Sequence, residues 1–196
     1  MKNFGILILM SFISNILFSQ VSSSPKLKIG DDAPGITGID QTGYKIESEK
    51  LIQQGAVVLI FYRGNWCPHC RRHLGNLQDS LNLLLEKGAS VVVVTPEAPE
   101  SIDKMVSKTG ATFSIIHDQG YKIMNKYGVS FTISASTVPR YFNSVLEKTR
   151  EANQNEDDIL PIPATFIIDK DKRIKYIHYN PDYRKRMSIA KILRLI

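Results

Sequence analysis

Cysteine is scarce in this chain, because Cys67 and Cys70 are the only two among its 196 residues. A chain with one closely spaced pair cannot be a scaffold held together by many disulfides. A glycine-rich phosphate-binding loop is also missing, since the 12 glycines are spread through predicted turns. We therefore expect no nucleotide or flavin site and no bound cofactor. No segment repeats at a fixed period, which excludes a repeat architecture.

The overall composition is that of an ordinary globular protein, with 43% hydrophobic and 22% charged residues. The length suits one domain with a proper core. The formal net charge is +6, but the basic residues are scattered, and the densest group is "YRKRM" at 183–187. We interpret this group as a solvated face, so no nucleic-acid partner is expected.

The first twenty residues contain no acid. They carry Lys2 near the start, an apolar run over 4–18 that is short for a membrane span, and Ser19 after it. This layout is typical of a secretory signal peptide, with cleavage near Ser19 or Gln20. We predict that residues 1–20 are removed and that the mature chain is periplasmic or secreted, with no membrane contact after cleavage. A retained anchor is the alternative.

Strand and helix patterns alternate after a Ser-rich linker at 21–28. Apolar β-branched runs predict strands, and apolar residues spaced by three and four predict helices. A hairpin comes first, and the segment at about 129–160 lacks a clean period, so we interpret it as an insertion with partial helix before the last strands. We expect strands at 56–62, 90–96, 113–118, 164–169 and 173–179, one long helix ending before Gly88, and helices at 99–110, 121–128 and 188–196. This order predicts an α/β domain over 29–196, with helices on both faces of a central sheet.

The two cysteines fall in the turn from the first long strand to the long helix. A helix N-terminus carries partial positive charge and free N–H groups, which favour a thiolate over a thiol. Cys67 is therefore expected to be the more acidic, attacking thiol, with Cys70 one turn inward to close a disulfide. A charged His69 would stabilise the thiolate, and Arg63 would do so from farther away. A stabilised thiolate makes the disulfide a stronger oxidant.

Two other interpretations of the pair are weaker. A purely structural disulfide would close a very small loop, which constrains the unfolded chain little. A metal site would use Cys67, Cys70 and His73, with His69 or a distant group as the fourth ligand. Structural zinc normally takes four ligands, and no second Cys or His pair stands at a suitable spacing. Redox chemistry is the favoured interpretation.

Three segments resemble a known family. They are "IGDDAPGITGIDQTG" near the start, "VVLIFYRGNWCPHCRRHLGNLQ" around the cysteines and "PIPATFIIDKDKRIKYIHYNPDYRKR" near the end. Over about residues 29–194 the chain resembles the thioredoxin superfamily, and within it the peroxiredoxin-like branch of the alkyl hydroperoxide reductase/thiol-specific antioxidant family. This resemblance implies a thioredoxin-like fold with a central mixed sheet flanked by helices, and an antioxidant or disulfide-exchanging oxidoreductase with a redox-active centre.

The resemblance also assigns roles near the cysteines. It implies that Pro163 is the cis-proline of the fold and faces the disulfide, where a missing backbone donor leaves neighbouring groups free to pair with a substrate. Trp66 would shield the Cys67 sulfur and offer a binding surface. The dipeptide Pro68–His69 is similar to that of periplasmic disulfide-forming oxidases.

The sequence departs from the family patterns at several positions. Peroxiredoxins present P-x-x-x-T-x-x-C, and on this chain the Pro, Thr and peroxidatic Cys positions are Arg63, Cys67 and Cys70. Peroxiredoxins also carry an arginine that stabilises the thiolate, and in this chain Pro163 occupies the position of that arginine. Thioredoxin carries a buried acid six residues before its first Cys, and here that position is Phe61. The base that would deprotonate Cys70 is therefore not identified by the sequence.

Three functions follow, in order of preference. The first is thiol–disulfide exchange, in which Cys67 attacks a substrate disulfide and Cys70 resolves the mixed disulfide. The second is a thiol peroxidase, in which one cysteine becomes a sulfenic acid and condenses with the other. The third is a non-enzymatic binding module whose disulfide stays shut. Electrons would come from a protein or small-molecule thiol, such as a thioredoxin-like donor, and the substrate would be a disulfide or a peroxide.

Overall fold

The structure is a computed structural model that describes residues 25–138 and 140–196. The predicted signal peptide at 1–20 lies outside the described residues, as does the first half of the predicted linker. None of the helices in the described ranges is long and apolar enough to cross a bilayer.

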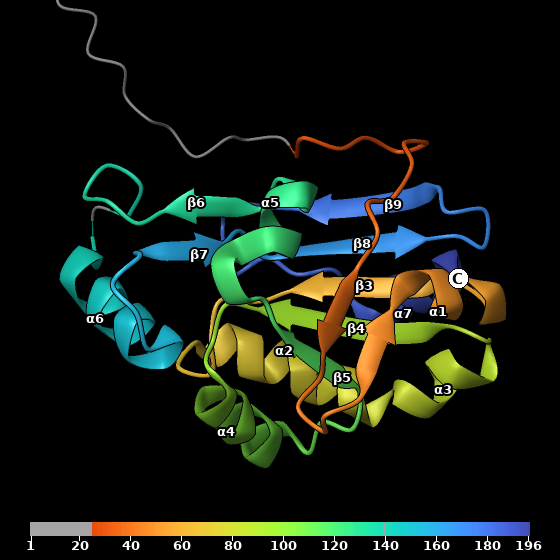
Figure 1. The fold of residues 1–196 in the computed structure, drawn as a ribbon, viewed down its shortest axis with the longest axis horizontal. Helices are drawn as coiled ribbons and strands as arrows, with labels where there is room; N and C mark the ends of the chain where they lie inside the picture. The colour runs from red at the N-terminus through yellow and green to blue at the C-terminus, as the bar shows by residue number, and fades with distance from the viewer. Residues whose placement is uncertain (1–24, 139) are drawn as a thin grey trace, which may run out of the picture.

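A five-stranded mixed sheet forms the centre of the molecule, with strand order β5-β4-β3-β8-β9 (Figure 1). Strands β3, β4 and β5 are parallel, and β8 pairs antiparallel with both β3 and β9. The bounds are β3 Val57–Phe61, β4 Ser90–Thr95, β5 Ser114–His117, β8 Ala164–Ile168 and β9 Ile174–Tyr179. Each of these strands lies where the sequence predicted one, which confirms the predicted mixed sheet.

Strand β3 is apolar on both faces because both faces are covered. Val58 and Ile60 belong to the core cluster under the helices that carry the cysteines and the chain's end. Val57 and Leu59 belong to the cluster on the opposite face, under the N-terminal hairpin. Successive side chains of a strand point to opposite faces, so one uninterrupted apolar run supplies both cores.

Helices cover the two faces of the sheet as predicted. The cysteine face carries α2 Pro68–Asp79, α3 Leu81–Glu86, α4 Pro99–Thr109 and α7 Ile189–Leu195. The other face carries α1 Ser48–Gln54, a 3₁₀ turn at Gln119–Tyr121, α5 Lys122–Tyr127 and the antiparallel hairpin of β1 Thr37–Ile39 with β2 Lys45–Glu47.

The prediction of a single long helix after the cysteines is wrong. The segment forms two helices, α2 and α3, which meet at Ser80. The backbone of Ser80 leaves the helical region (φ −107°, ψ 6°). Serine competes for backbone hydrogen bonds and so tolerates a helix end well. The apolar spacing hid this break, since Leu77 and Leu81 on either side of it are both buried. Leu85, expected on the same apolar face, is exposed.

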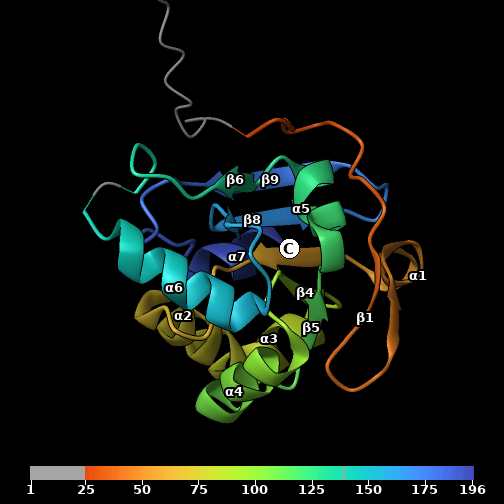
Figure 2. The same cartoon turned by 60° about the vertical axis from the view of Figure 1, so that its left-hand side comes forward.

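The segment predicted as an insertion folds as a strand, a helix and a strand. These are β6 Ser130–Thr132, α6 Phe142–Asn153 and β7 Ile159–Pro161, with β6 and β7 paired antiparallel. Helix α6 lies beyond the carboxyl ends of β3 and β4 (Figure 1), and Figure 2 brings this end forward with α6 beside α2. The segment therefore stands next to the turn that carries the cysteines.

Candidate active site

The turn between β3 and α2 presents Cys67 at the helix N-terminus. Cys67 is the N-cap residue with extended backbone angles, and Pro68 occupies the first helical position. Proline suits this position because its fixed φ is helical and its missing N–H would have no partner there. The Cys67 carbonyl accepts the backbone N–H groups of Cys70 and Arg71 at 3.0 and 3.1 Å. The predicted placement of the first sulfur at the helix start is confirmed.

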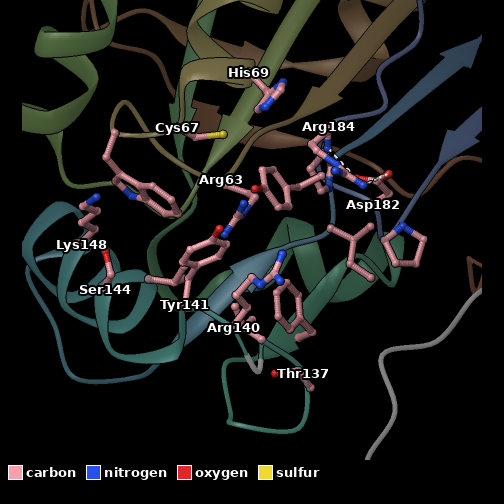
Figure 3. A pocket seen from close by; sticks show the side chains of 18 of the residues that line it. Arg63, Cys67, His69, Thr137, Arg140, Tyr141, Ser144, Lys148, Asp182 and Arg184 are labelled. Atoms are coloured by element: carbon pink, nitrogen blue, oxygen red, sulfur yellow. Dashed lines mark hydrogen bonds and ion pairs between the residues drawn. The ribbon is translucent and has the colours of Figure 1, made fainter.

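The two thiols differ in their position relative to a cavity. Both are free thiols and both are buried, at 1% exposure for Cys67 and 0% for Cys70. Cys67 lines a cavity of about 730 Å³ between the cysteine turn and α6, whereas Cys70 is not among its lining residues. A substrate in this cavity meets Cys67 first (Figure 3).

The proton distribution of the pair is opposite to the prediction. Burial favours the neutral thiol of Cys70, but the Cys67 thiol, the Arg186 guanidinium and the backbone N–H of Arg63 outweigh it and lower the Cys70 pKa to about 5. The pKa of Cys67 is raised, because its thiol proton is held by Cys70 and because it is buried. This distribution differs from the prediction that Cys67 is the more acidic thiol. Two thiols in contact titrate as a pair, and the pair loses its first proton easily.

Two arginines interact with the cysteine pair. Arg186, in the loop before α7, places Nη2 3.4 Å from the Cys70 Sγ. Arg63 is 5% exposed and lies between two ring faces, 4.8 Å from the centroid of Trp66 and 4.5 Å from that of Tyr183. Burial lowers the pKa of Arg63, and the charges of the two cysteines oppose that shift. No described carboxylate forms an ion pair with either arginine.

Three more residues were predicted to support the cysteine pair, and they lie near the cavity without all making the expected contacts. Trp66 is half-buried and packs against both the core under α2 and the cluster under α6, and its indole nitrogen has no described partner. Pro68 and His69 line the cavity. The His69 ring meets the edge of Tyr183 at 5.6 Å rather than a sulfur.

The predicted cis-proline is wrong. The bond before Pro163 is trans, as are the other peptide bonds of residues 25–138 and 140–196. The N–H of Ile162 donates to the Val129 carbonyl at 2.7 Å, and β8 begins directly after Pro163. The chain thus runs extended from β7 into β8, and the trans form is the lower in energy for an X–Pro bond. Pro163 does line the cavity that Cys67 borders.

Glu97 is a site residue that the sequence interpretation missed. It follows β4, is fully buried, and accepts two hydrogen bonds on Oε1 from Asn65, from the backbone N–H at 2.6 Å and from Nδ2 at 2.8 Å. Its Oε2 and the buried Tyr62 hydroxyl lie within each other's reach, but neither has a partner at full hydrogen-bond geometry. Burial raises the Glu97 pKa to about 7, and the negative charge of Cys70 adds to the rise.

A signal for Glu97 was present in the sequence. The stretch "TPEAP" follows the apolar strand β4, and β4 is the parallel neighbour of β3. The carboxyl ends of parallel neighbours meet at the same edge of a sheet, so an acid after β4 comes close to the turn after β3. Phe61, which holds the position of the thioredoxin acid, packs on the other face of the sheet against Tyr127 and Phe166.

The residue considered as a third metal ligand has another role. The buried His73 donates its ring Nε2 proton to the Met187 carbonyl at 3.0 Å, and burial lowers its pKa to about 4. This contact ties α2 to the loop that holds Arg186. Among the described residues, no group of three or more His, Cys, Asp or Glu side chains could hold a metal ion.

Comparison with known proteins finds a family model, similar sequences and a similar structure. The model of the AhpC/TSA family matches residues 29–177. Thiol-disulfide oxidoreductase ResA of Bacillus thuringiensis (strain Al Hakam) is 25% identical over 150 residues, which cover 76% of this chain and 68% of ResA. Chloroplastic peroxiredoxin Q of Populus jackii is 24% identical over 186 residues, which cover 95% of this chain and 73% of that protein. The crystal structure of peroxidoxin BcpB from Mycobacterium tuberculosis superposes with a TM-score of 0.66 at 20% identity, covering 86% of this chain and 96% of that one, and shares the fold.

Proposed function

Since this chain belongs to the AhpC/TSA family and is a thioredoxin-fold oxidoreductase, we propose that it catalyses thiol–disulfide exchange through Cys67 and Cys70. The observation that carries the proposal is the contrast between the two thiols. Cys67 borders an open cavity, and Cys70 behind it interacts with Cys67 and Arg186 and has a lowered pKa. A pair of this kind supplies an attacking sulfur and a resolving sulfur from one turn of helix.

In the first step the Cys67 sulfur attacks a substrate disulfide. The thiolate charge, held mainly on Cys70, moves to Cys67 as the proton between them passes to Cys70. A new bond forms between Cys67 and one substrate sulfur, the substrate S–S bond breaks, and the first thiolate leaves and takes a proton. Arg63 remains beside the reacting sulfur as an uncompensated positive charge.

In the second step Cys70 must lose its proton and attack Cys67. Glu97 is the proton acceptor in this proposal, because it is the buried carboxyl whose charge interacts with that of Cys70. The bond from Cys67 to Cys70 forms, the mixed disulfide breaks, and the second thiolate leaves. The protein has lost two electrons and the substrate has gained them. The reverse sequence, driven by a thiol donor, reduces the protein again.

Single cysteine substitutions test this assignment. Cys67→Ser is expected to lower the rate of exchange to that of the uncatalysed reaction, because no other sulfur borders the cavity. Cys70→Ser is expected to accumulate a stable mixed disulfide on Cys67, detectable by mass spectrometry. Unchanged exchange in Cys67→Ser would reject the proposal.

A peroxidase is the second candidate, and one contact favours it. The Cys70 sulfur, with its lowered pKa and an arginine 3.4 Å away, has the environment of a sulfur that peroxide oxidises. Peroxide would transfer one oxygen to form a sulfenic acid, and the other cysteine would condense with it and release water. Trapping the sulfenic acid in each single Cys variant tests this, and no trapped product in either variant rejects it.

We also propose that the protein is exported from the cytoplasm. This proposal rests only on the apolar segment at 4–18. The mature N-terminus is expected near Val21 when the protein is recovered from outside the cytoplasm of an expressing bacterium. N-terminal sequencing checks this, and an intact Met1 start on cytoplasmic protein would contradict it.

A further inference from the structure

The cavity beside Cys67 has the size of a small-molecule site. Its volume of about 730 Å³ falls within the range of roughly 300–1,000 Å³ that such sites occupy. One wall is the cysteine turn, and the other is α6 with the loop before it. Aromatic rings from Trp66, Tyr141 and Tyr183 supply the apolar surface.

The charged lining of this cavity is almost entirely positive. Arg63, Arg140 and Lys148 line it, and none of the three has a described hydrogen-bond or ion-pair partner (Figure 3). Asp182 is the one acid among the lining residues, and both its carboxylate oxygens are held by Arg184, at 2.8 and 3.0 Å. Arg140 and Lys148 therefore face the cavity without a described counter-charge, and Arg63 has only the thiolate of the cysteine pair beside it.

Not every cavity of the described residues has a positive lining. A second cavity, of about 550 Å³, lies between the N-terminal hairpin and α4. Its lining includes Asp40 and Asp103 and no lysine or arginine. A smaller cavity of about 370 Å³ beside α2 is also lined by cations, Arg72, Arg184 and Arg186, so the positive linings lie on the side of the molecule that carries the redox pair.

Arg63 gives the strongest reason for an anionic occupant. A buried cation without a counter-charge is costly, and in the reduced protein the thiolate charge of the pair compensates it. When the pair becomes a disulfide, that negative charge disappears and Arg63 has no anion beside it. A carboxylate on a bound molecule restores the compensation.

We propose that the cavity selects low-molecular-weight thiols and disulfides that carry carboxylates, over neutral or cationic ones of similar size. This rests on the exchange reaction proposed above, and it names the substrate class for that reaction. The aromatic walls hold the apolar part of the molecule, and the three cations hold its carboxylates while its sulfur meets Cys67.

The first experiment compares three disulfides with the reduced full chain. They are oxidised glutathione, which is anionic, bis(2-hydroxyethyl) disulfide, which is neutral, and cystamine, which is cationic. Fluorescence of Trp66, the only tryptophan, follows oxidation of the pair. We expect the second-order rate constant of oxidation to be about eightfold higher for the anionic than for the neutral disulfide, since each of the three cations contributes a factor of about two. Cystamine is expected to be slowest, and added salt is expected to reduce the differences.

A matched set of variants identifies the cations that cause the preference for the anionic disulfide. In the double variant Lys148→Gln, Arg140→Gln, the ratio of the anionic to the neutral rate is expected to fall to about twofold, the part left by Arg63. Lys104→Gln removes the same charge from an exposed site on α4 and is expected to leave the ratio unchanged. Equal rates for all three disulfides, or an equal fall of the ratio in Lys104→Gln, would overturn the proposal.

A binding measurement separates this proposal from the exchange reaction. S-methylglutathione carries the same carboxylates as glutathione but cannot exchange. Calorimetry is expected to show binding to the oxidised protein, tighter than to the reduced protein and weaker in the double variant. Suppose that no disulfide reacts, but S-methylglutathione binds more tightly to the oxidised than to the reduced protein and more weakly to the double variant. The exchange function is then rejected and the anion site is supported. Absence of binding would overturn the anion site.

Discussion

The two sulfurs of the redox pair lie three residues apart and face different surroundings. Cys67 borders a cavity lined with aromatic rings and unpaired cations. Cys70 is fully buried, contacts Arg186, and interacts electrostatically with the buried carboxyl of Glu97. The cavity side holds the groups that can recognise a substrate, and the interior side holds the groups that can move a proton.

This difference explains how a pair can have its acidic sulfur inside and its reactive sulfur outside. The charge rests on Cys70, where an arginine stabilises it, and Cys67 keeps the proton. Attack from the cavity needs only a proton shift between adjacent sulfurs. Resolution is the harder step, because the proton on Cys70 must then leave a site without solvent access, and Glu97 is the acceptor in the proposed mechanism.

Removing the carboxyl on the interior side is expected to have the largest effect. In Glu97→Gln, release of the second thiol should slow by about a hundredfold, the contribution of a positioned general base, while release of the first thiol changes little. A rapid-mixing experiment that resolves the two thiol releases measures this. The rate of the second release in the native protein should rise with pH around Glu97's pKa of about 7, and this rise should be absent in the variant.

Glu86→Gln serves as the control, since Glu86 is exposed at the end of α3 and has no described partner. It is expected to leave both thiol releases unchanged. If Glu97→Gln slowed both releases equally, the carboxyl would be supporting the turn through Asn65 rather than accepting a proton. A second release that is as fast as in the native protein would remove Glu97 from the mechanism.

The same carboxyl should also make stability depend on pH. Burial raises the Glu97 pKa from 4.5 to about 7 in the folded state, so folding favours the protonated form. Its contribution is fully present below about pH 4.5 and is lost as pH rises through about 7. The free energy of unfolding of the native protein relative to Glu97→Gln should fall by about 3 kcal/mol over that interval. Cys70 and His73, whose pKa values are lowered, act in the opposite direction in both proteins, so denaturant titrations of the two must be subtracted. A difference that does not vary with pH would contradict the buried ionisable state.

The comparison also separates what the sequence could predict from what it could not. The strand, the cysteine turn and the helix that follows are adjacent in the chain, so their order and the position of Cys67 at a helix start follow from local patterns. Arg186 is 116 residues from Cys70, and no local pattern indicates that contact. The prediction that Cys67 is the more acidic thiol considered the helix terminus without the arginine that contacts Cys70.

Tertiary packing accounts for the other failures in the same way. The break at Ser80 leaves the apolar spacing almost intact, so periodicity alone cannot detect it. Glu97 was detectable, since it follows a strand predicted to lie in the same sheet as the one before the cysteines. Predicting that Glu97 lies near the cysteines required knowing that β3 and β4 are neighbours in the sheet. The order of the strands in the sequence suggests this pairing but does not establish it.

The smallest expected effect in this comparison belongs to the arginine that contacts the inner sulfur. In Arg186→Gln the apparent pKa of the first thiol should rise by about one unit, because an opposite charge close to an ionised group shifts its pKa by at least that much. Ultraviolet absorbance of the thiolate against pH measures it. Arg72→Gln, an exposed arginine on the same helix as Cys70 with no described contact to either sulfur, should leave the pKa unchanged. Equal shifts in the two variants would mean that the general positive charge of the region, rather than the contact with Arg186, makes the inner thiol acidic. The surroundings of Cys70 would then differ from those of Cys67 only in the buried carboxyl of Glu97.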